Sequence, residues 1–145
     1  MAGRAPDPFP ELEREMAVLL RRARALSMEL AREVHPGLEA DAYGLLVRLD
    51  GPQGLRVTDL AGDLGVGKPT ISRQLALLEK LGLVERDTDP ADGRAFVFSL
   101  STDGRRRLRT VRTRRRQSFR KRLSSWAPDD VAQLARLLGD FNTLI

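Results

Sequence analysis

The stretch from Val57 to Leu100 constrains this chain of 145 residues more than any other, because it reads as two short helices joined by a glycine turn and followed by β-like runs. Leu60 and Leu64 lie four residues apart, so they share one side of the first helix. The segment Gly65-Val66-Gly67 predicts a tight turn, in which both glycines are free to take a positive φ. The expected result is a helix-turn-helix.

The second helix of this motif is predicted over residues 68–81. Pro69 falls in its first turn, where a missing N–H costs nothing, and Ile71 and Leu75 begin an apolar repeat of helical period. The opposite face carries small polar and basic side chains and has no carboxylate before Glu79. Because such a face can approach phosphates and base edges, the pattern predicts a recognition helix for nucleic acid.

A β-hairpin, or wing, is predicted over residues 83–100, with a turn at residues 88–93. Arg86 and Arg94 flank this turn. Arginine is attracted into narrow, A·T-rich minor grooves, so the hairpin is expected to contact DNA beside the recognition helix. The apolar side chains expected on one face of the second strand are Phe96, Phe98 and Leu100.

These residues resemble the wing signature of the multiple-antibiotic-resistance regulator (MarR) family, D-x-R-x5-L-T. Asp92-Gly93-Arg94 is followed by five residues and then by Leu100-Ser101, with serine in place of the last threonine. The helix-turn-helix is also similar to the family's pattern, and the long helices on either side match in length and order. The similar positions ahead of the wing are Leu60-Ala61, Leu64, Ser72-Arg73, Leu78-Glu79 and Gly82-Leu83-Val84.

Members of this family are winged-helix dimers that bind palindromic operators and often release them when a small phenolic or other ligand binds. The resemblance implies a mainly α fold with a small β-hairpin wing. It places a winged helix-turn-helix at 38–104, between dimerisation helices at 9–36 and 105–145, after a flexible leader at 1–8. The implied function is a sequence-specific transcriptional regulator, a repressor rather than an activator. The implied partners are double-stranded DNA, a second copy of the chain and a small organic ligand, with no cofactor.

DNA contacts are assigned to positions that match the motif. Arg73 is the best candidate for a bidentate contact with guanine. Asp92 is expected to orient Arg94, although an aspartate there also fits an ordinary turn. Gly67 and Pro69 depart from the family's usual longer polar residues, which places more weight on Arg73. The predicted base readers are Ser72, Arg73 and Gln74. The full predicted set is Thr58, Gly67, Lys68, Pro69, Thr70, Ser72, Arg73, Gln74, Arg86, Asp92 and Arg94.

Two amphipathic helices are predicted at the ends of the chain. From Phe9 to Leu30, apolar residues alternate at spacings of three and four, which predicts a helix over about 11–34. A last helix opens at Pro128 and repeats apolar residues to Ile145. A chain of this length cannot cover both stripes, so a two-fold dimer is expected, with an intramolecular core helix as the alternative. The predicted dimerisation residues are Phe9, Leu12, Met16, Leu19, Val131, Leu134, Leu138 and Phe141.

The resemblance also implies an effector pocket where the dimerisation helices meet the winged helix. Tyr43, on a short predicted helix at 39–49, and His35, at the end of the first helix, are candidates to line it. The alternatives are an ordinary packed tyrosine with its hydroxyl at the surface and a helix-end histidine. The predicted pocket residues are His35, Tyr43, Arg112 and Arg115. The inward-facing candidates on the short helix are Tyr43, Leu46, Val47 and Leu49.

Residues 105–122 contain eleven arginines or lysines and no acid. A solvated helix face is one interpretation. In another, Arg112 or Arg115 turns inward and pairs with a carboxylate, for example one on the acid-rich first helix. Contact with an anionic ligand or with DNA is the third, and the sequence leaves all three open.

Composition favours a polyanionic partner and excludes other classes. The formal net charge is +5 and arginine supplies 22 of the 25 basic residues, although an Arg-rich genome explains that ratio equally well. The absence of cysteine excludes disulfides and thiol chemistry. With a single histidine and no glycine-rich phosphate loop after a strand, no catalytic or metal constellation can be assembled, so an enzyme is not expected.

The chain has no apolar run of about 18 residues, so we expect a cytoplasmic protein with no membrane partner. The alternative function is a winged-helix module that binds other proteins or coats DNA without sequence choice. Salt dependence and competition with random DNA distinguish the two functions.

Overall fold

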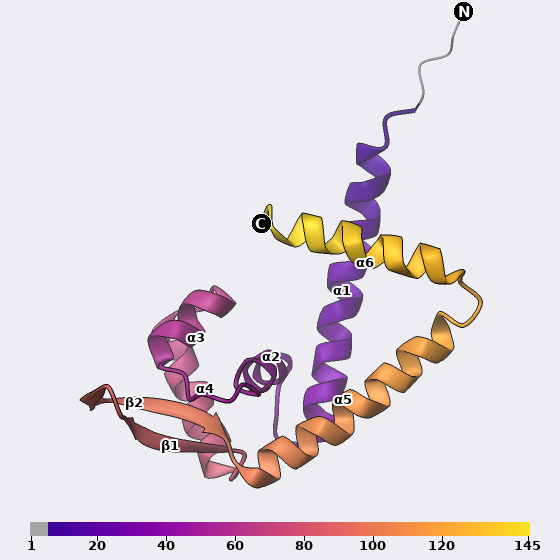
Figure 1. Cartoon of the computed structure of the whole chain (residues 1–145). Helices are drawn as coiled ribbons and strands as arrows, with labels where there is room; N and C mark the ends of the chain where they lie inside the picture. The colour runs from indigo at the N-terminus through magenta and orange to yellow at the C-terminus, as the bar shows by residue number, and fades with distance from the viewer. Residues whose placement is uncertain (1–5) are drawn as a thin grey trace, which may run out of the picture. The chain divides into compact units, whose positions relative to one another are not determined.

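The computed structural model describes residues 6–145, so most of the predicted leader lies outside the described residues. The described residues are mainly helical, with one antiparallel hairpin (Figure 1), and this confirms the predicted fold class. The chain divides into two compact units, one ending at Arg109 and the other spanning Thr110–Ile145. The elements are α1 (Phe9–Val34), α2 (Ala40–Arg48), α3 (Val57–Leu64), α4 (Lys68–Lys80), β1 (Val84–Asp89), β2 (Asp92–Leu100), α5 (Thr102–Arg122) and α6 (Pro128–Asn142).

The core of the first unit lies where α2 meets the end of α1 and the helix-turn-helix. α1 buries only its last turns, around Leu30 and Val34, where it packs on α2. Leu45 of α2 and Leu49, its C-cap residue, are completely buried. Val47 was expected to face inward but is 37% exposed, because its angular position on the helix lies away from those two leucines.

A single left-handed glycine separates α3 from α4. Gly65 has φ +62°, and the backbone N–H of Val66 bonds back to the Ala61 carbonyl. Gly67 has φ −63° and ψ 142°, so of the two glycines that were free to take a positive φ only Gly65 does. Gly67 instead occupies the extended N-cap position of α4, and Pro69 falls in the first turn.

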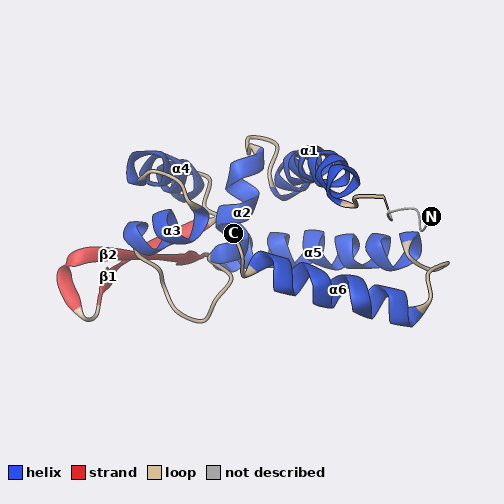
Figure 2. Ribbon diagram, turned by 90° about the horizontal axis from the view of Figure 1, so that it is seen from above, coloured by secondary structure: helices blue, strands red, loops and turns tan. Residues whose placement is uncertain are grey.

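The hairpin has the predicted extent, but its strands are longer and its turn is shorter than predicted. β1 and β2 run almost to the tip, so the turn is only Pro90-Ala91, with a register irregularity between Thr88 and Asp89. Figure 2 shows the hairpin projecting beyond α3 and α4. Phe98 is buried, whereas Phe96, two residues nearer the tip, is 50% exposed because it lies on the projecting part.

A short third β segment was not predicted. Leu55 and Phe98 exchange two backbone hydrogen bonds of 2.9 Å each, which join the segment before α3 to β2. Gly54 allows this approach, since a Cβ there would lie 2.9 Å from Val97. The start of α3 and the hairpin are therefore one connected structure.

α5 begins against the hairpin. The Ser101 hydroxyl donates to the Gly82 carbonyl at 2.6 Å and accepts the Gly104 backbone N–H at 3.0 Å, so Ser101 acts as the N-cap of α5. A Cβ at Gly104 would lie 2.0 Å from the Leu83 carbonyl oxygen. Only glycine permits this packing, because a clash with backbone cannot be relieved by a rotamer change.

The second unit consists of the rest of α5, a short turn and α6. α6 has no buried residue, and several of its apolar side chains are exposed. Those exposed by more than a third are Leu134, Leu137 and Leu138. Among residues 6–145, no helix is long and apolar enough to cross a membrane. The same residues hold no group of three or more acidic, histidine or cysteine side chains placed to bind a metal ion.

Candidate nucleic-acid interface

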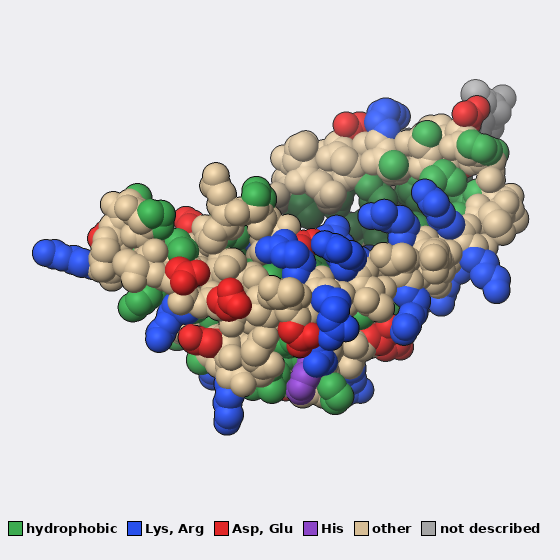
Figure 3. Space-filling model, turned by 60° about the horizontal axis from the view of Figure 1, so that its bottom comes forward, with side chains coloured by type: hydrophobic (Ala, Val, Ile, Leu, Met, Phe, Trp, Pro, Cys, Tyr) green, Lys and Arg blue, Asp and Glu red, His purple; other side chains and the backbone are tan. Residues whose placement is uncertain are grey.

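The outer face of α4 is the centre of the predicted interface. Ile71 and Leu75 are fully buried and fix how the helix is rotated against α3. That rotation leaves Lys68, Ser72 and Arg73 exposed on the outside. Figure 3 shows one face of the molecule, on which Lys and Arg side chains are interspersed with Asp and Glu. The arrangement presents hydrogen-bond donors on a convex helix, which the width of a major groove admits.

A groove of about 440 Å³ separates α4 from the hairpin and the start of α3. Two predicted contact residues, Thr58 from the first turn of α3 and Ser72 from α4, lie on its walls. Apolar side chains of the hairpin make up much of the remainder. The lining residues are Arg56, Val57, Thr58, Ser72, Ala76, Glu79, Arg86, Ala95, Phe96 and Phe98.

Arg94 lies near the tip of the hairpin and is exposed. Asp92 contacts the backbone of Arg94 and not its side chain, because the Asp92 Oδ1 accepts the Arg94 backbone N–H at 3.1 Å. The other carboxylate oxygen of Asp92 lies 3.9 Å from Nη1 of Arg56. Asp92 therefore shapes the turn that presents Arg94, which combines the two interpretations left open by the sequence.

Arg86 is held against α4. Its guanidinium carbon lies 4.7 Å from the centre of the Phe96 ring, and its Nε lies 3.6 Å from Oε1 of Glu79. A guanidinium stacked on an aromatic ring and paired with a carboxylate is partly committed within the protein. Of the two arginines predicted to flank the tip, Arg94 is the more available for a nucleic-acid contact.

A partly buried ion pair near the tip was not predicted from the sequence. The Arg56 Nε donates to Oδ2 of Asp89 at 2.5 Å, and the Asp89 side chain is only 11% exposed. The Ala91 N–H, and after it the Arg56 guanidinium, lower the pKa of the Asp89 carboxyl from its usual value. The hydrogen bond to Asp89 raises the pKa of Arg56. No local pattern signals the pair, because 33 residues separate its members.

The four predicted pocket residues belong to different units. Tyr43 is 4% exposed, and its hydroxyl has no hydrogen-bond partner among the described residues. The alternative that this hydroxyl lies at the surface is therefore wrong for this chain. His35 forms the C-cap of α1, and its Nδ1 accepts the Gly37 N–H at 3.0 Å. Arg112 and Arg115 lie in the second unit.

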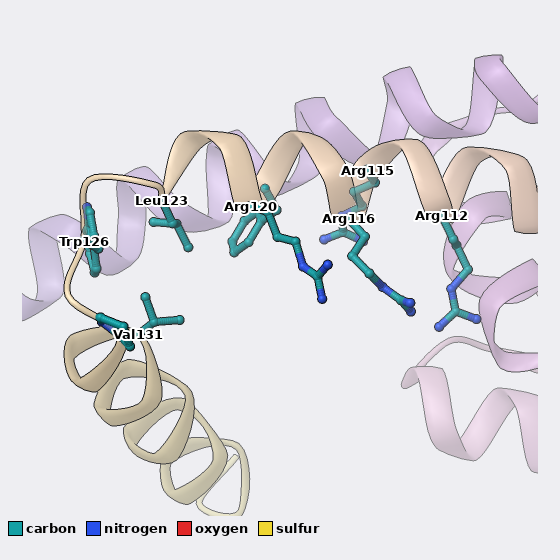
Figure 4. Close-up of a pocket in the computed structure, with 9 residues that line it drawn as sticks. Arg112, Arg115, Arg116, Arg120, Leu123, Trp126 and Val131 are labelled. Atoms are coloured by element: carbon teal, nitrogen blue, oxygen red, sulfur yellow. The ribbon is translucent and has the colours of Figure 1, made fainter.

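Arg112 and Arg115 line a groove of about 800 Å³ between α5 and the start of α6. In Figure 4 the side chains of Arg112, Arg116 and Arg120 extend from α5, and apolar side chains gather where the chain turns into α6. The groove thus combines guanidinium groups with an apolar, partly aromatic wall. The remaining lining residues are Phe119, Leu123, Trp126, Pro128 and Val131.

The first arginines of the basic run bind within the first unit. Arg105 Nη1 lies 3.1 Å from Oδ1 of Asp50, and Arg107 donates to Asp103 at 2.8 Å and to the Val34 carbonyl at 3.3 Å. The run is therefore neither wholly a solvated face nor wholly a ligand site. Internal pairing begins earlier along α5 than Arg112 and Arg115, the two residues singled out from the sequence.

Comparison with known proteins places this arrangement in a family. The family model described as MarR family matches residues 37–95, which include the helix-turn-helix and the tip of the hairpin. A relative from Bacillus subtilis (strain 168), described as the uncharacterized HTH-type transcriptional regulator YxaD, is 31% identical over 136 residues, 94% of each chain. The chain belongs to the MarR family. It is a DNA-binding transcriptional regulator, and MarR-family regulators are not enzymes.

Solved structures of the MarR family have the same fold. The MarR family transcription regulator SP03579 superimposes with a TM-score of 0.83 at 18% identity, over 95% of this chain and 90% of that one. A MarR family regulator from Listeria monocytogenes, solved in complex with 26mer DNA, gives a TM-score of 0.75 at 20% identity, over 91% and 87%. At these identities the likeness concerns the fold alone.

Proposed function

We propose that this MarR-family protein is a homodimeric repressor that binds a palindromic operator and is released from it by a small organic ligand. The observation that carries sequence-specific reading is the exposed face of α4 around Arg73, which has no carboxylate before Glu79, beside the projecting hairpin with Arg94. Residues 38–104 contact DNA, and helices at 9–36 and 105–145 hold the two subunits together. Repression needs only occupancy, because a bound dimer excludes other proteins from that DNA.

Exposed apolar side chains on the terminal helices support self-association. Leu12 and Leu19 of α1 are each 50% exposed, and Leu134 of α6 is 38% exposed. Because such a side chain is already about half covered, burying the rest of it is worth about 1 kcal/mol. A two-fold dimer presents two copies of α4 about one DNA turn apart, roughly 34 Å, and a palindromic site follows from that symmetry.

The effector is proposed to be a small aromatic or aliphatic anion. Guanidinium groups of α5 in the same groove as the Phe119 and Trp126 rings suit a carboxylate attached to an apolar body. Release is tested by titrating aromatic carboxylates and their uncharged amides against the protein–operator complex. Equal release by acids and amides would exclude a role for the arginines.

The operator is identified by selecting random duplex DNA with the purified protein at physiological salt and sequencing what it retains. Enrichment of a palindrome with half-sites one turn apart is expected. Retention without any enriched sequence, abolished as salt rises, would instead support the architectural function.

Arg73→Ala tests the assignment of the base reader. We expect a loss of about 1–3 kcal/mol in binding free energy at one operator position, with relaxed preference there, because a bidentate guanine contact is removed. Binding to operators substituted at each position, measured by fluorescence anisotropy, gives the result. A uniform loss at every position would show a phosphate contact instead.

A further inference from the structure

We propose that Arg56 and Asp89 are positioning residues for DNA reading: their ion pair holds the hairpin at a fixed place relative to α3 and so sets where Arg94 meets the operator. Neither residue is among those predicted to contact DNA. The inference rests on the proposed function in one respect, namely that Arg94 reads or contacts DNA from the hairpin.

The pair joins two elements at the place where the hairpin has least support. The hairpin is anchored at the Leu55–Phe98 bridge, and Phe98 lies opposite Arg86 in the strand register. Asp89 is three residues farther along β1, about 10 Å nearer the tip at the usual rise of a strand. The neighbouring tip residues are exposed, so the Arg56–Asp89 pair is a contact with the body of the domain well beyond the backbone bridge.

Both side chains are themselves held in place. Asp89 uses its second oxygen, Oδ1, to accept the Ala91 N–H at 2.8 Å, which closes the turn. Arg56 is the N-cap residue of α3, and its backbone N–H donates to Asp59 at 3.0 Å. Because the capping contact uses the backbone, changing the Arg56 side chain leaves that contact available. A nearly buried carboxylate bound at both oxygens is a rigid anchor.

The pairing of β1 with β2 places Arg94 close to this anchor. Asp89 pairs with Asp92 across the hairpin, and the Asp92 carboxylate accepts the Arg94 backbone N–H. Arg94 therefore lies two residues from the position opposite the anchor. A tip without the anchor samples more orientations, and ordering it on DNA then costs binding free energy.

If only electrostatics mattered, removing the Asp89 carboxylate would strengthen DNA binding. Removing a carboxylate from a DNA-binding surface raises the positive charge of that surface and so strengthens attraction to phosphates. If Asp89 is a positioning residue, its replacement by asparagine weakens binding in spite of the added charge. The side-chain oxygen of the introduced asparagine can still accept the Ala91 N–H. Asp89→Asn therefore removes the ion pair with Arg56 and keeps the hydrogen bond that closes the turn.

The matched control is Asp63→Asn. Asp63 also pairs with an arginine at 2.5 Å, namely Arg48, and it lies on α3 away from the hairpin. Both variants break one Arg–Asp pair, and both raise the net charge by one unit because they remove a carboxylate. For Asp89→Asn we expect about fivefold weaker operator binding and loss of preference for A·T-rich flanks. For Asp63→Asn we expect unchanged or tighter binding.

A second measurement needs no DNA. The chain has no cysteine, and a Cβ at Gly93 meets no atom within 4 Å, so a nitroxide on Gly93→Cys reports the tip alone. Spectra of the spin label should show faster motion when Asp89→Asn or Arg56→Ala is added, and a spectrum near the original with Arg56→Lys. Unchanged spectra with Asp89→Asn would overturn the anchor even if the protein bound no operator.

The outcomes separate the two proposals. A mobile tip with unchanged DNA affinity would retain the anchor but overturn its role in DNA reading. The role in DNA reading would also be overturned if Asp89→Asn bound the operator as tightly as Asp63→Asn and kept the preference for A·T-rich flanks. Circular dichroism of each variant establishes that the helical fold is kept, so that weaker binding reflects the hairpin and not unfolding.

Discussion

Asp89 shows at the scale of one residue how a carboxylate becomes structural. Its carboxylate accepts hydrogen bonds from the Ala91 N–H and from the Arg56 guanidinium. Both bonds lower its pKa from the usual value, and the bond from Ala91 has the larger effect. Since the pKa in the folded protein is below that in the unfolded chain, the associated stability is present above the unfolded pKa. It is lost as the pH falls through the folded pKa.

This linkage predicts how the stability of Asp89→Asn compares with that of the unsubstituted protein. The difference in free energy of unfolding should be constant near pH 7 and shrink as the pH falls below about 4, the ordinary aspartate pKa. Urea unfolding of both proteins at a series of pH values measures it. A difference that stays constant down to pH 2 would mean that the folded and unfolded pKa values of Asp89 are the same.

The first turn of α5 shows at the element scale how one close contact orients a whole helix. Ser101 accepts the Gly104 N–H and donates to the Gly82 carbonyl, while its own N–H bonds to the Leu83 carbonyl at 3.0 Å. These bonds bring α5 against the backbone at the start of the hairpin. Farther along the same helix, Leu108 is fully buried.

Gly104→Ala is expected to destabilise the protein by about 1–3 kcal/mol, because the added Cβ meets backbone that cannot rotate away. The control is Gly62→Ala in α3, where a Cβ meets no atom within 4 Å. That change should be neutral or stabilise by up to about 1 kcal/mol through helix propensity. Thermal unfolding followed by circular dichroism compares them. A Gly104→Ala variant as stable as Gly62→Ala would show that α5 can shift without cost.

At the scale of the whole molecule, the uncovered surfaces are the terminal helices. α1 carries the exposed side chains of Leu12 and Leu19, and α6 carries those of Leu134 and Leu138. Exposed apolar surfaces of this kind are complementary between copies of one chain. This complementarity supports the proposed homodimer.

Leu19→Asp tests the dimer, because it places a charge in the centre of the proposed interface. Loss of the half of Leu19 that the dimer buries, about 1 kcal/mol, corresponds to roughly fivefold weaker association, and the unpaired charge of the aspartate weakens it further. Analytical ultracentrifugation should show a monomer at concentrations where the unsubstituted protein is a dimer. Val47→Asp is the control, since Val47 is 37% exposed on α2, outside the proposed interface. Identical sedimentation of all three proteins would contradict the proposal.

The sequence by itself determined the helices, the turn between α3 and α4, the hairpin and the family. These features depend on residues at most a few positions apart, such as the spacing of Ile71 and Leu75 or the wing motif ending at Ser101. It could not show that Gly67 keeps a negative φ, because glycine permits both signs and the neighbouring structure selects one.

Only the tertiary structure decided which distant side chains meet. The Arg56–Asp89 pair, the Leu55–Phe98 bridge and the packing of Gly104 on Leu83 join positions 21 to 43 residues apart. Each depends on the angles at which whole elements pack, and those angles are set by the shared core and not by any local pattern. The same reason explains why the exposed polar face of α4 was predictable while the support of the hairpin was not.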